Sequence, residues 1–468
     1  MLPYTRSVNV SQPPRDPIRN VLSLEPADTA DDLLKEKPRP QPEERGGPLG
    51  VLRQLGPGLI AGVSDDDPSN IGVYAQAGSR FGLGTLWLFL VTAPLMAAVQ
   101  ETCARVALQT GVGLGRSLGR KFPRKLVGLL LLALVVGNCI TLGADLSAVA
   151  AGIELLLPFR VPILWLVLPA ALVLLLMQLR LTYETIAKTF KYLTIALFAY
   201  VAQAVLLRPD PGRLLAATFV PHLQLSNDFA MIVVAVLGTT LSPYVFFWQA
   251  SLVVHERRLE GKTTEESRRG ASFGKLLRTR ADLLVGVVVA QLVMYCLVVS
   301  TALVLNAHGK HDVQSASEAA EALKPLAGRF ASLLFSAGLI GSGLLTIPVL
   351  SASSAYVVGE FFNLPGTLGT KARYRPAFYA ILTAAVLAGV LINLVHLNPI
   401  QALVFASVIE GVIAAPLLVL IVLLASDAKV MRDRASGWLS KALLWIAAAV
   451  MTVASVYYLA QLATGHGG

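Results

Sequence analysis

Long apolar stretches recur along the sequence from residue 57 almost to its end, and they constrain the fold more than any other feature. About eleven of them approach the roughly 20 residues that a helix needs to cross a bilayer. They are expected at 57–80, 83–108, 126–153, 161–179, 186–207, 229–254, 281–306, 330–358, 376–397, 401–425 and 439–462. With 55% hydrophobic residues and a mean hydropathy of +0.64, the chain is predicted to be an all-α integral membrane protein.

The two ends of the sequence differ in character. Residues 1–50 are rich in Pro, Arg, Asp and Glu and show no apolar period, which predicts a disordered tail. Residues 51–468 then form the transmembrane domain. Cys103, Cys139 and Cys296 are spaced singly in apolar segments, a pattern that fits neither a disulfide framework nor a zinc site.

Basic residues collect in alternate loops. The loop after the second stretch holds Arg116, Arg120 and Lys121, and the loop after the sixth holds Arg268 and Arg269. This distribution explains the net charge of +10 better than a nucleic-acid partner does. The positive-inside rule places these loops and the N-terminus in the cytoplasm and the C-terminus outside, as in a multi-pass protein of the plasma membrane.

The sequence DDDPSN at residues 65–70 interrupts the first apolar stretch. Charged side chains are costly in the hydrocarbon core, so acids within a span indicate a functional site. A proline removes a backbone donor and breaks the helix. Because broken backbone at membrane depth is tolerated only where protein buries it or water lines it, this segment predicts an unwound helix with ligating groups at mid-membrane.

A second break follows five stretches later, where GTTLSPYVFFWQ occupies residues 238–249. One such proline is compatible with an ordinary kink. Two at matching positions indicate the binding site of a transporter built from inverted repeats. The repeats are expected at 57–207 and 229–425, with an extra helix at 439–462.

The side chains at the two breaks offer oxygen ligands. Asp67 supplies a carboxylate and Asn70 an amide oxygen, Ser242 adds a hydroxyl, and the unwound backbone near Ser64 and Thr239 exposes carbonyls. Oxygen-only sites suit Mg²⁺, Ca²⁺ and Mn²⁺. The resulting hypothesis is a partly hydrated Mg²⁺, replaceable by Mn²⁺, held by Asp67 and Asn70 with Ser242 or Thr239 acting through water.

The segments around the two breaks resemble the Nramp divalent-metal transporters. Gly56-Pro57-Gly58 followed by Asp67-Pro68-Ser69-Asn70 is similar to the first helix of that family, whose signature is Asp-Pro-Gly-Asn. Residues 96–105, 143–146 and 238–249 look like its second, third and sixth helices. The resemblance covers nearly everything except the tail. It implies the LeuT/APC-type inverted five-plus-five repeat, with helices 1 and 6 broken at mid-membrane.

The resemblance also implies a set of site residues. The metal ligands of the family fall on Asp67 and Asn70, with backbone carbonyls at Ser64 and Thr239. The metal is the transported substrate, so no cofactor is implied.

Several positions depart from the family pattern. Ser242 stands where the sixth helix normally carries a methionine ligand, Tyr244 and Gln249 replace histidines, and Ala148 replaces an acid. The Nramp-related magnesium transporters also lack that methionine, and this sequence looks most similar to them. The departures favour Mg²⁺ over soft metals and weaken the expectation of proton coupling.

The roles of several further charged residues have two possible interpretations each, whereas Tyr244 has one. Asp66, like Asp65, either attracts dications or caps the unwound helix end. Asp145 matches a family position linked to proton exit, or is a structural partner for an arginine. Glu410 either joins the ion site or pairs within the bundle. Tyr244 is expected to pack rather than to ligate, because aromatics fill apolar space.

Glu101 and Arg105 lie four residues apart on the second stretch. They are expected to form an intrahelical ion pair.

Three functions are alternatives to a Mg²⁺ transporter. A proton-coupled Mn²⁺/Fe²⁺ transporter of the Nramp type is one, and a Na⁺-coupled organic-solute symporter on the same fold is another. Three acids at the first break would repel a carboxylate substrate, which counts against the symporter. An intramembrane enzyme that binds diphosphate through Mg²⁺ needs a second Asp-rich motif, and residues 239–244 hold none. No enzymatic activity is therefore predicted.

Overall fold

The computed structural model describes residues 66–180, 198–224, 226–262, 264–313, 316–320, 328, 331–364, 366, 368, 372, 375–395, 398–431 and 436–463. Helices dominate these ranges, and none of the described residues forms a β-strand. The helices are α5 (Pro68–Phe81), η1 (Gly82–Thr85), α6 (Leu88–Thr110), α7 (Leu114–Lys121), α8 (Arg124–Glu154), α9 (Ile163–Arg180), α11 (Pro211–Phe219), α12 (Asn227–Thr240), α13 (Pro243–Leu259), α14 (Glu265–Arg268), α15 (Phe273–Val304), η2 (Asn306–His308), α16 (Ala316–Ala320), α18 (Ala331–Phe362), α19 (Pro376–Ile392), η6 (Asn393–Val395), α20 (Pro399–Ala425), α21 (Ala428–Met431) and α22 (Trp438–Ala463).

The helices coincide with the expected apolar stretches, except that most of the fifth stretch, like the tail at 1–50, lies outside the described residues. Within the described part, 7 helices are long and apolar enough to cross a membrane when α12 and α13 count as one. The α5–η1 segment and α6 meet that test only together, and they are bent by 114° relative to each other. The prediction of an all-α membrane protein with broken spans is confirmed.

The second break separates α12 from α13 at Leu241 and Ser242. Pro243 is the first residue of α13 and lacks the N–H that would continue the helix. The residue before a proline is pushed toward extended backbone, and Ser242 accordingly has φ −63° and ψ 121°. Leu241, with φ −108° and ψ 45°, is also non-helical. The Ser-Pro pair thus ends one helix and starts the next within a single span.

The first break shows the same chemistry at Asp67-Pro68. Pro68 opens α5, and Asp67 is its N-cap residue with φ −78° and ψ 171°. Proline is well suited to the first position of a helix because its missing N–H would be unpaired there anyway. Ser64 and Asp65 lie outside the described residues, so the part of the first span before the break is not described.

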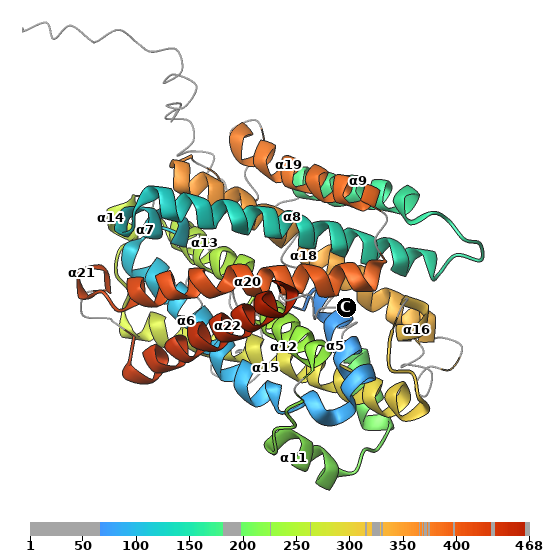
Figure 1. The fold of residues 1–468 in the computed structure, drawn as a ribbon. Helices are drawn as coiled ribbons and strands as arrows, with labels where there is room; N and C mark the ends of the chain where they lie inside the picture. Colours follow the sequence, from blue (N-terminus) through green and yellow to red (C-terminus); the bar gives the residue numbers. More distant parts are fainter. Residues whose placement is uncertain are drawn as a thin grey trace, which may run out of the picture.

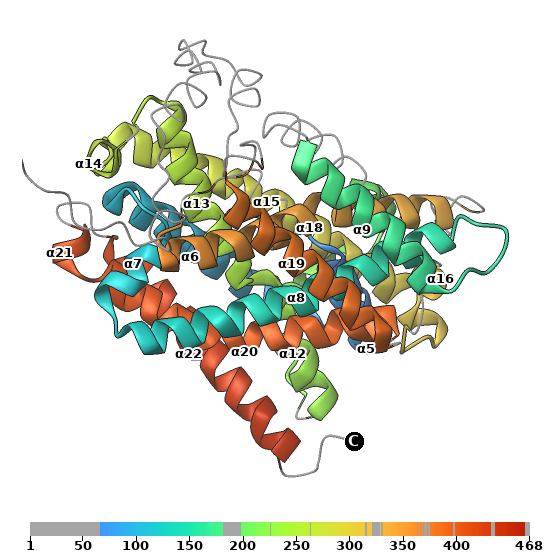
Figure 2. The same cartoon turned by 90° about the horizontal axis from the view of Figure 1, so that it is seen from above.

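Two groups of helices pack against each other around this pair of breaks. One group contains α5, α6, α12, α13 and α15, and the other contains α8, α9, α18 and α19. Helix α20 contacts α5 and α12 in the first group and α8 in the second, while α13 packs against α18. Figures 1 and 2 show α8 and α20 running side by side through the body of the molecule.

Helices α12 and α20 approach each other most closely at Gly238. A Cβ atom at Gly238 would lie 2.0 Å from the carbonyl oxygen of Ser407 and 2.7 Å from the backbone nitrogen of Gly411. Only glycine therefore fits at position 238, four residues before Ser242. This contact fixes the last turn of α12 against α20.

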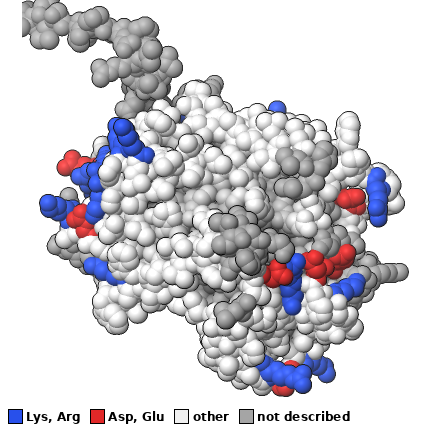
Figure 3. Space-filling model, in the orientation of Figure 1, with Lys and Arg blue, Asp and Glu red and all other residues white. Residues whose placement is uncertain are grey.

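One end of the molecule carries α7, α14 and α21, which lie together in both ribbon views (Figures 1 and 2). Figure 3 shows Lys and Arg side chains gathered over this end, with a few acids among them. We call it the basic end. It includes Arg120 and Lys121 of α7, Arg268 of α14 and Lys429 of α21.

Candidate functional site

Asp67 connects the first break to the second. Its Oδ1 accepts a hydrogen bond from the backbone nitrogen of Asn70 at 2.7 Å, which caps α5. Its Oδ2 accepts a hydrogen bond from the hydroxyl of Tyr244 at 3.0 Å, and Tyr244 belongs to the first turn of α13. Both side chains are fully buried. The expectation that Tyr244 only packs was therefore incomplete, since its hydroxyl is a partner of Asp67.

A second bond joins the same two segments about two turns further along α5. The hydroxyl of Tyr74 in α5 lies 2.6 Å from that of Thr240, the last residue of α12. Thr240 in turn donates to the carbonyl of Val236 at 2.6 Å. The first turns of α5 thus contact both sides of the second break.

Ser242 satisfies backbone groups that the second break leaves open. Its hydroxyl lies 2.7 Å from the carbonyl of Thr239 and 3.2 Å from that of Gly238. A hydroxyl that bonds back to the preceding turn stabilises a carbonyl whose helical donor is missing. The hydroxyl of Thr239 is buried and has no hydrogen-bond partner among the described residues. In this structure the carbonyl of Thr239, an expected ligand, is bonded to Ser242.

Two further acids reach the breaks from other helices. Asp145 in α8 accepts a hydrogen bond at 2.9 Å from the hydroxyl of Ser69, the residue between Pro68 and Asn70. Its partner is thus a serine of α5 and not the arginine that one interpretation expected. Glu410 in α20 accepts a hydrogen bond from Thr141 of α8 at 2.8 Å.

The acids around the breaks interact electrostatically with one another. The charge of Asp67 acts on Asp66, Asp145 and Glu410, and that of Glu410 acts on Asp145. Within the described ranges no lysine or arginine forms an ion pair with any of these four acids. Buried carboxylates need hydrogen-bond donors or a cation to offset the loss of hydration. A cation bound here would therefore offset the cost of burying these carboxyl groups.

Asp66 precedes Asp67 and Asn70 follows it by three residues, and both side chains are buried. Asn70 sits in the first turn of α5, beside the Asp67 carboxylate that accepts its N–H. One carboxylate oxygen of Asp66 has no hydrogen-bond partner in the described part of the chain. The capping role that one interpretation gave to Asp66 belongs to Asp67.

Gln249 does not join this cluster. It lies seven residues after Ser242, or about two helical turns along α13 toward the basic end. Its side chain is fully buried, and neither its Oε1 nor its Nε2 has a hydrogen-bond partner among the described residues. Seven residues bring it back to nearly the same face of α13 as Ser242.

Helix α18 contributes hydroxyl groups that were not among the expected site residues. Ser353 donates to the carbonyl of Tyr244 at 2.9 Å, and Asn138 of α8 donates to Ser354 at 3.1 Å. Three serines at positions 351, 353 and 354 inside an apolar span are the sequence feature that could have indicated them. The expected pair within α6 is confirmed, since Arg105 Nε donates to Glu101 Oε1 at 3.0 Å.

The donor set restricts how a metal ion would be held. Among the described residues no three His, Cys, Asp or Glu side chains converge in a way that could hold a metal. A cation beside Asp67 would then take its remaining ligands from amide, hydroxyl, carbonyl or water oxygens. Such ligands suit hard cations, which keep part of their hydration.

A pocket elsewhere along α8 has different chemistry. It lies between α8, η6 and α20 and contains no acid. Its lining residues are Ile140, Gly143, Ala144, Ser147, Ile392, Asn393, Ala402 and Phe405. We therefore place the candidate site at the two breaks and not in this apolar pocket.

Comparisons with known proteins agree with this geometry. The model of the Nramp family (Natural resistance-associated macrophage protein-like) matches residues 58–461. The "Divalent metal cation transporter MntH" of Deinococcus radiodurans is 31% identical over 349 residues, which cover 72% of this chain and 76% of the relative. The protein of the same name from Bacillus subtilis is 24% identical over 413 residues, or 87% of this chain and 92% of the relative.

Solved structures show a similar fold. A manganese transporter from Eremococcus coleocola superposes with a TM-score of 0.70 at 17% identity, covering 92% of this chain and 90% of the other. Mhp1, a nucleobase-cation-symport-1 family transporter, gives a TM-score of 0.55 at 14% identity, covering 86% of this chain and 92% of the other. At these identities the likeness concerns the fold alone.

Proposed function

Because this chain belongs to the Nramp family, we propose that it carries a divalent metal cation across the membrane by alternating access, with Mg²⁺ as the main substrate and Mn²⁺ as a substitute. The relatives named above are divalent metal cation transporters. A transporter of this family is not an enzyme and needs no cofactor, since the metal is its cargo.

The observation that carries the proposal is the group of buried acids that have no basic partner in the described part of the chain. Asp67, Asp145 and Glu410 come from three different helices and are each at most 2% exposed. In the proposed site Asp67 and Asn70 bind the ion, and Ser242 or Thr239 binds it through water. The expected carbonyl of Ser64 would complete the set from the segment before Asp66.

Ser242 supports the choice of a hard cation. A thioether at this position would help to select soft transition metals, whereas a serine offers an oxygen and leaves more space. Mg²⁺ requires about six oxygens in octahedral geometry and gives up its water reluctantly. A small hydroxyl beside Asp67 is therefore better suited to a partly hydrated ion than a methionine is.

We also propose an orientation. By the positive-inside rule the basic end belongs in the cytoplasm of a plasma-membrane protein. Its basic residues include Arg120, Lys121, Arg268 and Lys429. The N-terminus would then be cytoplasmic and the C-terminus outside, and the ion would enter the cytoplasm at the basic end.

Uptake by purified protein in liposomes tests the substrate. Internal pH is recorded while Mg²⁺, Mn²⁺ or Ca²⁺ is added outside, and empty liposomes serve as the control. We expect Mg²⁺ and Mn²⁺ to enter without acidification. Entry of Mn²⁺ alone would overturn the assignment of Mg²⁺.

The second candidate is a proton-coupled Mn²⁺/Fe²⁺ transporter. The similarity to proteins named for divalent metals and manganese favours it. Acidification of the liposome interior together with metal entry would select this candidate over uncoupled transport.

A further inference from the structure

Glu360, near the end of α18, binds two other helices at the basic end. Its Oε2 accepts a hydrogen bond from the backbone nitrogen of Gly115 at 2.9 Å, in the first turn of α7. Its Oε1 accepts one from the hydroxyl of Ser251 in α13 at 2.8 Å. The N-cap residue of α7, Gly113, has no side chain to cap the helix. Glu360 therefore supplies the negative charge that stabilises a helix start while it also binds α13.

The fit of Glu360 against α7 is close. A Cβ atom at Gly113 would lie 1.8 Å from Glu360 Oε1, and one at Gly115 would lie 3.1 Å from the Cβ of Glu360. The Glu360 side chain thus occupies the space that a larger residue at position 113 would need. This contact determines the separation between α18 and α7.

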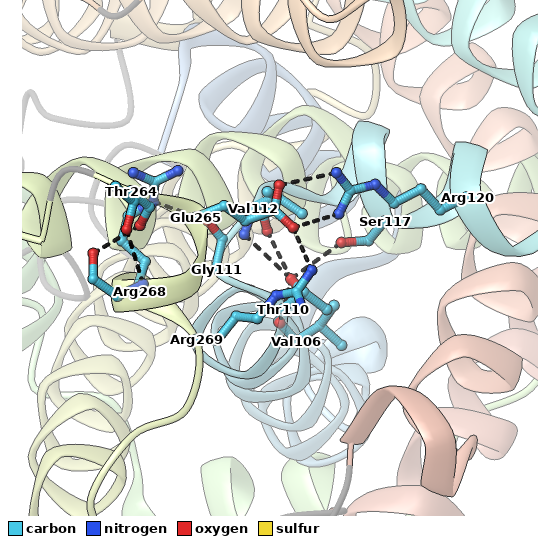
Figure 4. Close-up of polar contacts among 11 residues, drawn as sticks. Val106, Thr110, Gly111, Val112, Ser117, Arg120, Thr264, Glu265, Arg268 and Arg269 are labelled. Carbon is cyan, nitrogen blue, oxygen red and sulfur yellow. Dashed lines mark hydrogen bonds and ion pairs between the residues drawn. The ribbon is translucent and has the colours of Figure 1, made fainter. Parts of the chain in front are cut away.

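The other end of α7 is bound by the connection between α13 and α15. Arg120 donates two hydrogen bonds to Glu265 of α14, Nη1 to Oε1 at 2.7 Å and Nη2 to Oε2 at 2.9 Å. Arg269 donates to the same Oε1 at 2.5 Å. Figure 4 shows Glu265 between these two arginines. A bidentate pair of this kind fixes geometry as well as adding energy.

The connection is also held at the α6–α7 corner. Arg268 Nε donates to the carbonyl of Gly111 at 3.0 Å, and Arg268 is 5% exposed (Figure 4). Gly111 ends α6 with φ +70°, and a Cβ atom there would lie 2.7 Å from the carbonyl oxygen of Glu265. The backbone of α14 therefore lies directly against this corner.

These contacts restrict the movement of α13, whose first residue, Pro243, follows the second break. Along its length α13 is bound to α18 and α7 through Ser251 and Glu360, and the chain that follows it is bound to α7 through Glu265 and Arg120. Helix α13 cannot move relative to α7 and α18 while both contacts persist. Helices of the two packed groups must shift relative to each other in alternating access.

We propose that Glu265 and Glu360 are positioning residues of the transport cycle, which clasp α13 to α7 and must release it before the ion can leave at the basic end. The inference rests on the proposed transport function, and it adds a gate at the basic end, where Ser251 and Glu265 follow Ser242 by 9 and 23 residues. We call the Glu265–Arg120 and Glu360–Ser251 contacts the α7 clasp.

A thiol-reactivity experiment tests the clasp without using metal. Cys103, Cys139 and Cys296 are replaced by serine, and Ala355→Cys is introduced as a reporter. Ala355 is fully buried in the cluster that packs α18 against α13. The rate at which a membrane-impermeant maleimide labels this reporter in nanodiscs measures how often α13 and α18 separate.

Glu265→Gln should raise the labelling rate about two- to fivefold, the range expected for the loss of a partly exposed ion pair. Glu360→Gln should raise it about tenfold or more, because the half-buried carboxylate accepts two hydrogen bonds, from Gly115 and from Ser251. Glu266→Gln is the matched control, since Glu266 is the exposed neighbour of Glu265 and should leave the rate unchanged. Equal rates for Glu265→Gln and Glu266→Gln would overturn the clasp.

A charge swap separates positioning from a merely structural role. Glu265→Arg alone should increase labelling, and adding Arg120→Glu should restore the rate of the parent. In Mn²⁺ uptake, Glu265→Gln should change the maximal rate with little change in KM, because the ion site is intact. No rescue by the swap, or an altered KM with an unaltered maximal rate, would refute the positioning role.

The two proposals fail in different ways. If the parent protein takes up neither Mg²⁺ nor Mn²⁺, the proposed function fails, and the labelling rates still report on the clasp. If uptake is normal but labelling is the same in all variants, the clasp fails and the proposed function stands.

Discussion

Replacing Asp67 with asparagine removes the charge that would bind the ion and keeps most of the hydrogen bonds that Asp67 makes. Asparagine is as good an N-cap residue as aspartate, so its Oδ1 still accepts the hydrogen bond from Asn70. The new Nδ2 group faces the hydroxyl of Tyr244, which can accept a bond instead of donating one. Asp67→Asn therefore tests the charge separately from the fold.

The structure gives the expected magnitudes. Asp67→Ala would remove the cap of α5, which costs about 1 kcal/mol, and remove the hydrogen bond that the buried hydroxyl of Tyr244 donates to Asp67, which costs about 1–3 kcal/mol more. Asp67→Asn should cost less than about 1 kcal/mol, because both contacts are replaced. Groups that merely support a metal ligand contribute about 10–100-fold to affinity. Loss of the ligand charge itself should therefore weaken Mn²⁺ binding at least about 100-fold, or about 2.7 kcal/mol.

Titration calorimetry with Mn²⁺ and Mg²⁺ on the purified protein measures the affinity, and thermal unfolding of the same samples measures the stability. Asp210→Asn is a matched control, since Asp210 also precedes a proline and caps a helix, α11, by accepting from Gly212 at 2.9 Å. The control should bind metal as the parent does. If Asp67→Asn binds Mn²⁺ within about threefold of the control, Asp67 is not a ligand.

Two other predictions concern Ser242 and Glu265. Ser242→Met should shift binding from Mg²⁺ toward Cd²⁺ in competition titrations, because it restores a thioether at the second break; an unchanged rank order would show that position 242 does not face the ion. Hydrogen bonds from Arg120 lower the pKa of Glu265 from 4.5 to about 2. Its stabilisation, about 0.2–1 kcal/mol for such a pair, is therefore complete well above pH 4.5 and lost as the pH falls toward 2. The unfolding midpoints of the parent and Glu265→Gln should differ at neutral pH and converge in acid, and a constant difference down to pH 2 would contradict this reasoning.

The second break could be predicted from the sequence because it depends on two adjacent residues. A proline after a serine determines the backbone of both residues, whatever surrounds them. The same rule located the start of α5 at Pro68. Long apolar runs likewise predicted the helices, since little else can cross a bilayer.

The direction in which side chains point was harder to predict. Glu410 lies in a helix that is apolar on nearly all sides, so no periodicity indicates which side faces Thr141. Tyr244 was expected to pack, since the sequence does not reveal that Asp67 of another helix lies within reach of its hydroxyl. One of the two interpretations gave the capping role to the acids before Asp67, although the Asp-Pro pair itself is a typical start of a helix.

The double role of Asp67 limits what position 67 can tolerate. Asparagine would keep the cap of α5 and lose the charge. Glutamate would keep the charge but is not a favoured N-cap residue, and its extra methylene would move the carboxylate away from Tyr244. Serine would cap the helix and carry no charge. In the proposed site, aspartate is therefore the residue that both caps α5 before Pro68 and presents a charge to the cation.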